Sequence, residues 1–67
     1  MKPKFLVIIK LEDNLIEMYV TRAVSWALRY IFRKKSNRVS LQIMDMKTGE
    51  PVNIEIKKIE SYTFIRI

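Results

Sequence analysis

The order of apolar and polar residues predicts four strands and one long helix. Residues 4–11 are apolar at nearly every position, which is typical of a strand that is covered on both faces or lies centrally in a sheet. Apolar and polar residues alternate over 39–44 and over 52–57, and Gly49 between them favours a hairpin turn. The last apolar run, 62–67, is either a fourth strand or a bulged continuation of the third.

The helix is predicted to run from about residue 13 to Lys35. Asp13 or Asn14 offers an N-cap, acidic residues lie near the start, and basic residues lie in the last turn, as the helix dipole favours. On a helical wheel the apolar residues cover about half of the circumference, and this half is expected to face the sheet. Its members are Leu15, Ile16, Tyr19, Val20, Ala23, Val24, Trp26, Ala27, Tyr30 and Ile31.

These elements predict an α+β fold of order β-α-β-β-β, with one long helix packed on a small, mostly antiparallel sheet. A chain of 67 residues is expected to form a single domain, 1–67. No apolar run is long enough for a membrane span or for the core of a signal peptide, which predicts a cytoplasmic protein.

The residue inventory argues against catalysis. The chain has no Cys and no His, so disulfides, Cys/His zinc sites and Ser–His or Cys–His nucleophiles are excluded. No two of the seven carboxylates have a spacing that predicts a shared acid–base cleft, and the single glycine cannot form a phosphate-binding glycine-rich loop. We therefore expect a protein that is not an enzyme and that needs no metal and no cofactor.

The charge predicts an anionic partner. Thirteen Lys and Arg against seven Asp and Glu give a net charge of +6, which favours nucleic acid, an acidic protein surface or an anionic membrane surface. The membrane is the weakest of the three, because the apolar half of the helix is needed to cover the sheet.

Two apolar residues lie on the polar half of the predicted helix. Leu28 and Phe32 are an i,i+4 pair bordered by Arg22, Arg29 and Arg33, and arginine and aromatic residues are enriched at protein interfaces. This pair is predicted to contact a partner protein. The alternative is that the helix is rotated, or that a loop covers the pair.

A cluster of four positive charges follows at the end of the helix. The cluster has no acidic residue among its members, which are Arg33, Lys34, Lys35 and Arg38. Such a cluster complements the helix dipole and keeps the chain soluble. It is also suited to contact phosphates or carboxylates. The predicted partner-binding residues are therefore Leu28, Phe32, Arg22, Arg29, Arg33, Lys34, Lys35 and Arg38.

In size, basic charge and use of the whole chain as one domain, the sequence resembles the small basic inhibitors of the DNA sliding clamp (PCNA) of Thermococcales archaea. The segment 42–46 is the nearest to a clamp-binding box but lacks its aromatic pair. The resemblance implies a protein that binds a clamp subunit without that box, disturbs the closed ring and inhibits DNA replication. The first functional hypothesis is therefore a regulator or inhibitor that binds the acidic or apolar surface of another protein. Homodimer formation stays open.

The alternative hypothesis is a small basic nucleic-acid-binding protein. Tyr62 and Phe64 alternate onto one face of the last strand and are suited to stack on bases. The glycine and aromatic signature of an RNA-recognition motif is missing, as are a GXXG loop, a zinc finger and a helix-turn-helix. The sequence thus supports nucleic-acid binding through charge and aromatic residues rather than through a known motif.

Overall fold

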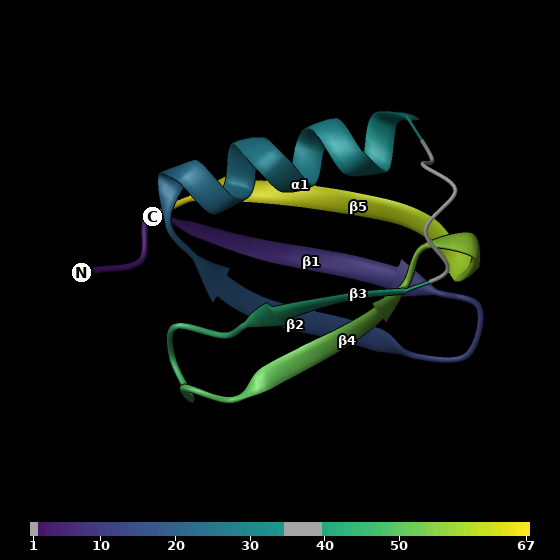
Figure 1. Ribbon diagram of the computed structural model, residues 1–67, viewed down its shortest axis with the longest axis horizontal. Coiled ribbons are helices and arrows are strands. Elements are labelled where there is room, and N and C mark those ends of the chain that lie inside the picture. Colours follow the sequence, from purple (N-terminus) through teal and green to yellow (C-terminus); the bar gives the residue numbers. More distant parts are fainter. Residues whose placement is uncertain (1, 35–39) are drawn as a thin grey trace.

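A computed structural model describes residues 2–34 and 40–67, which fold into five strands and one α-helix with a short 3₁₀ helix (Figure 1). The elements are β1 (Phe5–Leu11), β2 (Leu15–Val20), α1 (Arg22–Lys34), β3 (Ser40–Met44), β4 (Pro51–Glu55), η1 (Ile56–Lys58) and β5 (Ile59–Arg66). One helix packs with small antiparallel sheets, so the predicted α+β class is confirmed.

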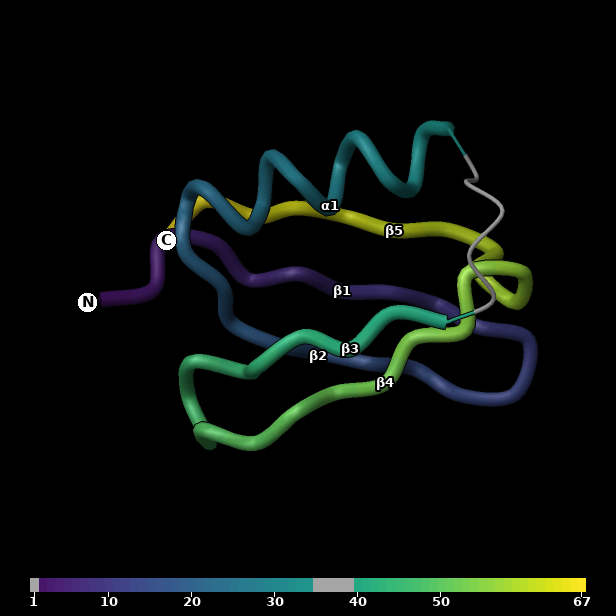
Figure 2. The backbone as a smooth tube through the Cα atoms, in the orientation of Figure 1, coloured from purple at the N-terminus to yellow at the C-terminus, as the bar shows by residue number. Residues whose placement is uncertain are grey.

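Strand β1 is the centre of a three-stranded antiparallel sheet of order β2-β1-β5. Val7 lies opposite Met18 of β2 and opposite Phe64 of β5. The central position explains why β1 is apolar on both faces, as its sequence predicted. In Figure 2, both ends of the chain lie toward the end of the molecule at which α1 starts.

Strands β3 and β4 form a separate antiparallel pair. Gly49 lies in their connection with φ at +76°, a left-handed conformation that glycine adopts without steric cost. The buried carboxylate of Asp45 accepts hydrogen bonds from the backbone N–H groups of Tyr19 and Lys47, both at 3.0 Å. The N–H of Met46 donates to the carbonyl of Tyr19 at 2.8 Å, so this hairpin is joined to the outer edge of β2.

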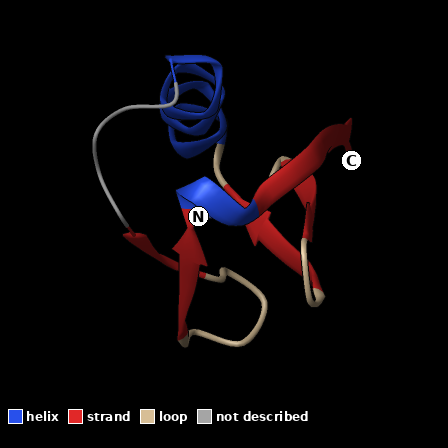
Figure 3. Ribbon diagram, turned by 90° about the vertical axis from the view of Figure 1, so that its right-hand side faces the viewer, coloured by secondary structure: helices blue, strands red, loops and turns tan. Residues whose placement is uncertain are grey.

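The core lies between the two sheets and α1, and in the end-on view the sheets diverge below the helix (Figure 3). Each strand places the side chains of one of its faces in this core, and the helix contributes a single row of apolar side chains. The buried apolar cluster consists of Val7, Ile9, Leu11, Met18, Val20, Leu28, Phe32 and Ile54.

The predicted helix start is wrong, because 15–20 form β2 rather than the first turns of a helix. Ile16, Met18 and Val20 alternate with more exposed neighbours, which is a strand period. The helix begins after Thr21, whose hydroxyl oxygen accepts the N–H of Val24 at 3.3 Å and acts as the N-cap. The molecule therefore has a strand that the predicted element order lacked.

The predicted rotation of the helix is also wrong. Leu28 and Phe32 are buried, at 1% and 4% exposure, whereas Trp26 and Tyr30 are 65% and 60% exposed. The helical wheel included residues 15–20, which are not helical, and their apolar side chains fell on the same side of the wheel as Trp26. In the structure, the face of α1 that meets the sheets is the one that contains Leu28 and Phe32.

Candidate functional site

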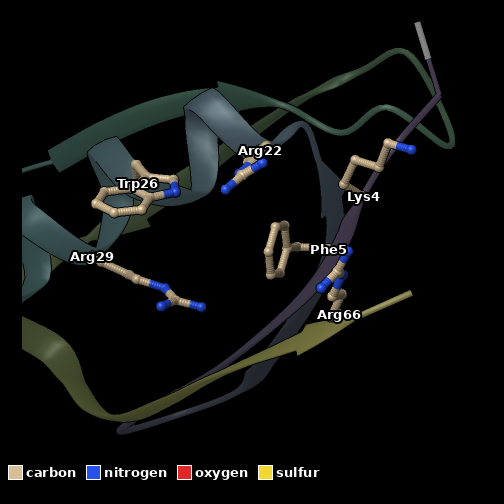
Figure 4. Close-up of a pocket in the computed structure, with 6 residues that line it drawn as sticks. All are labelled: Lys4, Phe5, Arg22, Trp26, Arg29 and Arg66. Carbon is tan, nitrogen blue, oxygen red and sulfur yellow. The ribbon is translucent and has the colours of Figure 1, made fainter.

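A cleft of about 350 Å³ lies between the first half of α1 and the adjoining ends of β1 and β5 (Figure 4). Four cationic and two aromatic side chains line it, and no carboxylate does. The lining residues are Lys4, Phe5, Arg22, Trp26, Arg29 and Arg66. In the close-up, the side chains of Arg22 and Arg29 extend from the helix toward the ring of Phe5.

The backbone positions these side chains from three segments. Arg22, Trp26 and Arg29 are spaced i, i+4, i+7 and therefore share one side of α1. Phe5 and Arg66 are direct partners in the register of β1 and β5. Lys4 extends this pairing, because its carbonyl accepts the N–H of Ile67 at 2.9 Å. The cleft therefore forms only when the first and last strands pair.

Arg29 is held between two aromatic rings. Its guanidinium carbon lies 5.7 Å from the ring centroid of Phe5 and 4.8 Å from that of Phe64, within the range of cation–π attraction. Arg29 also lines a second hollow of about 280 Å³, together with Arg33, Tyr62 and Phe64. We call the two hollows together the arginine cleft. It continues along α1 past Arg29.

Aromatic contacts join the arginine cleft to the core. The ring centroid of buried Phe32 lies 5.0 Å from that of Tyr62 and 6.3 Å from that of Phe64. Tyr62 and Phe64 meet edge to face at 5.9 Å, a favoured aromatic geometry. The Tyr62 and Phe64 rings are therefore fixed by packing and offer a preformed surface.

The positive charge of the cleft is not neutralised by ion pairs. In the part of the chain that the structure describes, the ion pairs are Lys10–Glu60, Lys58–Asp13 and Lys58–Glu55, and none involves an arginine. Like charges that converge without counter-charges raise the local potential and attract anions.

The start of α1 adds to this potential. The first turn contains no acidic residue, and Arg22 stands where the helix dipole is positive. A cation at this end disfavours the helix by roughly 0.3–1 kcal/mol. Helix stability therefore does not explain why Arg22 is there.

The structure divides the predicted partner-binding residues into four groups, of which the last, Leu28 and Phe32, is buried. Arg22, Arg29 and Arg33 lie on the arginine cleft, and Lys34 lies 4.8 Å from the ring centroid of Tyr30, on the exposed side of α1. Lys35 and Arg38 lie outside the described residues.

The predicted partner contact through Leu28 and Phe32 has to be corrected, because both are core residues and present no surface to a partner. Sequence reasoning missed Lys4, Phe5, Trp26 and Arg66. Only the register of β1 with β5 brings Lys4, Phe5 and Arg66 to the helix, and no local signal contains that register.

No protein-family model, curated protein or solved structure matches this chain. Within residues 2–34 and 40–67, no group of three or more Asp, Glu, His or Cys residues is placed to hold a metal ion. The helices in the same residues include none with the length and apolar character needed to cross a membrane.

Proposed function

We propose that this chain is a non-catalytic binding protein and that the arginine cleft binds single-stranded nucleic acid. The observation that carries the proposal is the convergence of five cations and four aromatic rings along the arginine cleft, with no carboxylate in the lining of either hollow. Phosphate contacts supply most of the affinity for nucleic acid, and aromatic rings supply stacking platforms for bases.

The two kinds of side chain have separate roles. Lys4, Arg22 and Arg66 are exposed and are suited to contact successive phosphates. The indole of Trp26 is 65% exposed, and a base stacked on it contributes about 1–3 kcal/mol of binding free energy. A single strand suits the cleft better than a duplex, because only an unpaired base exposes its face for stacking.

The other hypothesis, a protein-binding inhibitor of the sliding clamp and of DNA replication, stays a prediction. The contact pair on which it was based, Leu28 and Phe32, is buried in the core. What supports it now is the positive potential of the arginine cleft, which would also favour an acidic protein surface. A test of the proposed function must therefore separate nucleic acid from acidic polypeptide.

The single tryptophan of the chain makes that test direct. Trp26 lies in the cleft, so its fluorescence reports ligand binding at that site alone. We would titrate the full chain with an oligothymidylate of roughly 12 nucleotides, within the site sizes of single-strand binders. Stacking should quench the fluorescence, and log Kd should rise linearly with log salt as counterions are released.

Two other polyanions complete the experiment. Inorganic polyphosphate has the charge without bases, and polyglutamate resembles an acidic protein surface. We expect oligothymidylate to bind more tightly than either at equal charge, and only oligothymidylate to quench Trp26 by stacking. Equal affinity for polyglutamate and oligothymidylate would overturn the nucleic-acid proposal in favour of an acidic protein partner. Absence of quenching by oligothymidylate would overturn the role of Trp26.

A further inference from the structure

The side chains of β5 that face α1 form a row whose chemistry changes along the strand. Tyr62, Phe64 and Arg66 are spaced two residues apart, and they pair with the β1 residues whose side chains pack into the core. The two rings line the second hollow of the arginine cleft, of about 280 Å³, and Arg66 lines the first hollow, of about 350 Å³. The row therefore passes from aromatic to cationic toward the end of the cleft at which α1 starts.

The positive charge of the cleft is divided unevenly between the two hollows. Arg29 lines both of them. The second hollow has one further cation, Arg33, whereas the first has three, which are Lys4, Arg22 and Arg66. These three side chains are exposed, and no ion pair of the described residues involves any of them. The first hollow thus has a concentrated charge that remains available to a ligand.

The two hollows match different parts of a nucleic-acid strand. In the interior of a strand, each phosphodiester has one negative charge and is followed by a base, which an arginine beside a ring complements. A terminal phosphomonoester has a charge of about −1.5 to −2 at pH 7 and three strong acceptor oxygens. Cations that converge in one hollow repel one another, and a ligand with two charges relieves this repulsion more than a ligand with one. The first hollow therefore complements the end of a strand better than its interior.

We propose that the first hollow binds the phosphorylated end of a nucleic-acid strand, with the terminal phosphomonoester held by Lys4, Arg22 and Arg66. Trp26 lies one helical turn after Arg22 in the same hollow and is 65% exposed, so it is placed to stack on the terminal base. The rest of the strand then follows α1 past Arg29 into the second hollow. This inference rests on the proposed function and specifies its ligand as a strand end.

The experiment compares oligothymidylates of roughly 8 nucleotides that have a phosphate at the 5′ end, at the 3′ end or at neither end. Trp26 fluorescence measures each Kd at about pH 7.5, where the terminal phosphate has its second charge. We expect a phosphate at one end to tighten binding about tenfold and the same group at the other end to have little effect. An unphosphorylated oligothymidylate two nucleotides longer has the same total charge and should not show the gain.

Substitutions locate the gain within the cleft. Arg66→Gln should remove most of it, and Lys4→Gln, at a position before β1, tests the same charge without altering a strand. Arg33→Gln acts in the second hollow, so it should weaken the phosphorylated and unphosphorylated ligands equally and preserve their ratio. Lys57→Gln removes an exposed cation outside the cleft and should change neither affinity. Circular dichroism of each variant checks that its fold is retained.

The pH dependence of the gain provides a second measurement. The titratable side chains that line the first hollow are Lys4, Arg22, Arg29 and Arg66, and the chain has no histidine. These side chains keep their charge between about pH 5 and pH 7.5, whereas the second ionisation of a terminal phosphate has a pKa of about 6. The gain should therefore shrink as the pH is lowered through this range, while the affinity for the unphosphorylated strand stays nearly constant.

Three results would overturn the binding of a strand end: no gain from a phosphate at either end, an equal gain from both ends and from the longer strand, or a gain that survives both Arg66→Gln and Lys4→Gln. In each case the unphosphorylated oligothymidylate still binds, so the proposed function stands and only this inference fails. If no oligothymidylate binds, the proposed function fails and this inference fails with it.

Discussion

The two long sides of α1 differ in what they do. One side places Leu28 and Phe32 in the core, while the other places Arg22, Trp26 and Arg29 along the cleft. The largest aromatic side chain of the helix is on the exposed side, and a leucine only two positions away is almost completely buried. The difference teaches that hydrophobicity alone does not identify the core side of this helix. The side with Leu28 and Phe32 supports stability, and the side with the arginines and the indole is suited to binding.

The largest expected effect is a loss of folding stability from a substitution on the buried side of α1. Leu28→Ala should lower the free energy of unfolding by about 3 kcal/mol, because it leaves a cavity in a small core. Denaturant unfolding followed by circular dichroism measures this loss. Trp26→Ala is the matched control and should change stability by less than about 0.5 kcal/mol. If both variants lose the same stability, the two sides of α1 do not divide as described.

The next effect is on binding. Arg29→Ala should raise the Kd for oligothymidylate about tenfold and lower the salt slope by roughly one, because a phosphate contact and the stacked guanidinium are both lost. Fluorescence quenching of Trp26 measures both quantities. Arg29→Lys keeps the charge and should retain the salt slope with part of the affinity. Lys57→Ala removes an exposed cation outside the cleft, and a loss there as large as that of Arg29→Ala would contradict the site.

A somewhat smaller effect should separate stacking from charge. Trp26→Ala should raise the Kd about fivefold while leaving the salt slope unchanged, because a stacking surface is lost but no cation is. Anisotropy of a labelled oligothymidylate measures this change, since the variant has no tryptophan. Trp26→Phe retains an aromatic face and should recover most of the affinity. A changed salt slope in Trp26→Ala would show that the indole acts by positioning the arginines.

The smallest effect concerns a cation far from the cleft. A hydrogen bond from Lys58 to Glu55, together with the charges of Glu55 and Asp13, raises the pKa of Lys58 above its ordinary value of 10.5. A raised pKa means that the ion pairs support folding below pH 10.5 and lose this contribution as the pH rises through the folded-state value. Lys58→Gln should therefore be slightly less stable than wild type at neutral pH, and equally stable once Lys58 is deprotonated. A difference that persists at strongly alkaline pH would exclude the ion pairs as its cause.

Local patterns predicted the elements that depend on local interactions. The β1 strand and the β3–β4 hairpin with its glycine turn follow from short-range signals. The predicted helix end at Lys35 lies outside the described residues. Residues 15–20 satisfy both a helical wheel and a strand period, and only their antiparallel pairing with β1 decides between them. A short segment has too few residues to separate the two periods.

The sequence predicted only the part of the site that lies on the helix, because that part depends on local spacing. Arg22, Arg29 and Arg33 are neighbours on a helix, so the sequence indicates a shared positive surface. Lys4 and Arg66 lie at opposite ends of the chain and reach the cleft only through the pairing of β1 with β5. Such long-range register depends on the packing of the whole sheet rather than on any local sequence signal.

The Asp45 carboxylate closes one edge of the three-stranded sheet. It accepts the N–H of Tyr19, and the N–H of Met46 donates to the Tyr19 carbonyl, so both backbone groups of Tyr19 are bonded on the side of β2 that faces away from β1. A strand whose outward backbone groups are already bonded is a poor template for a further strand. Loss of the Asp45 side chain would leave the Tyr19 N–H without this partner and would reopen part of that edge.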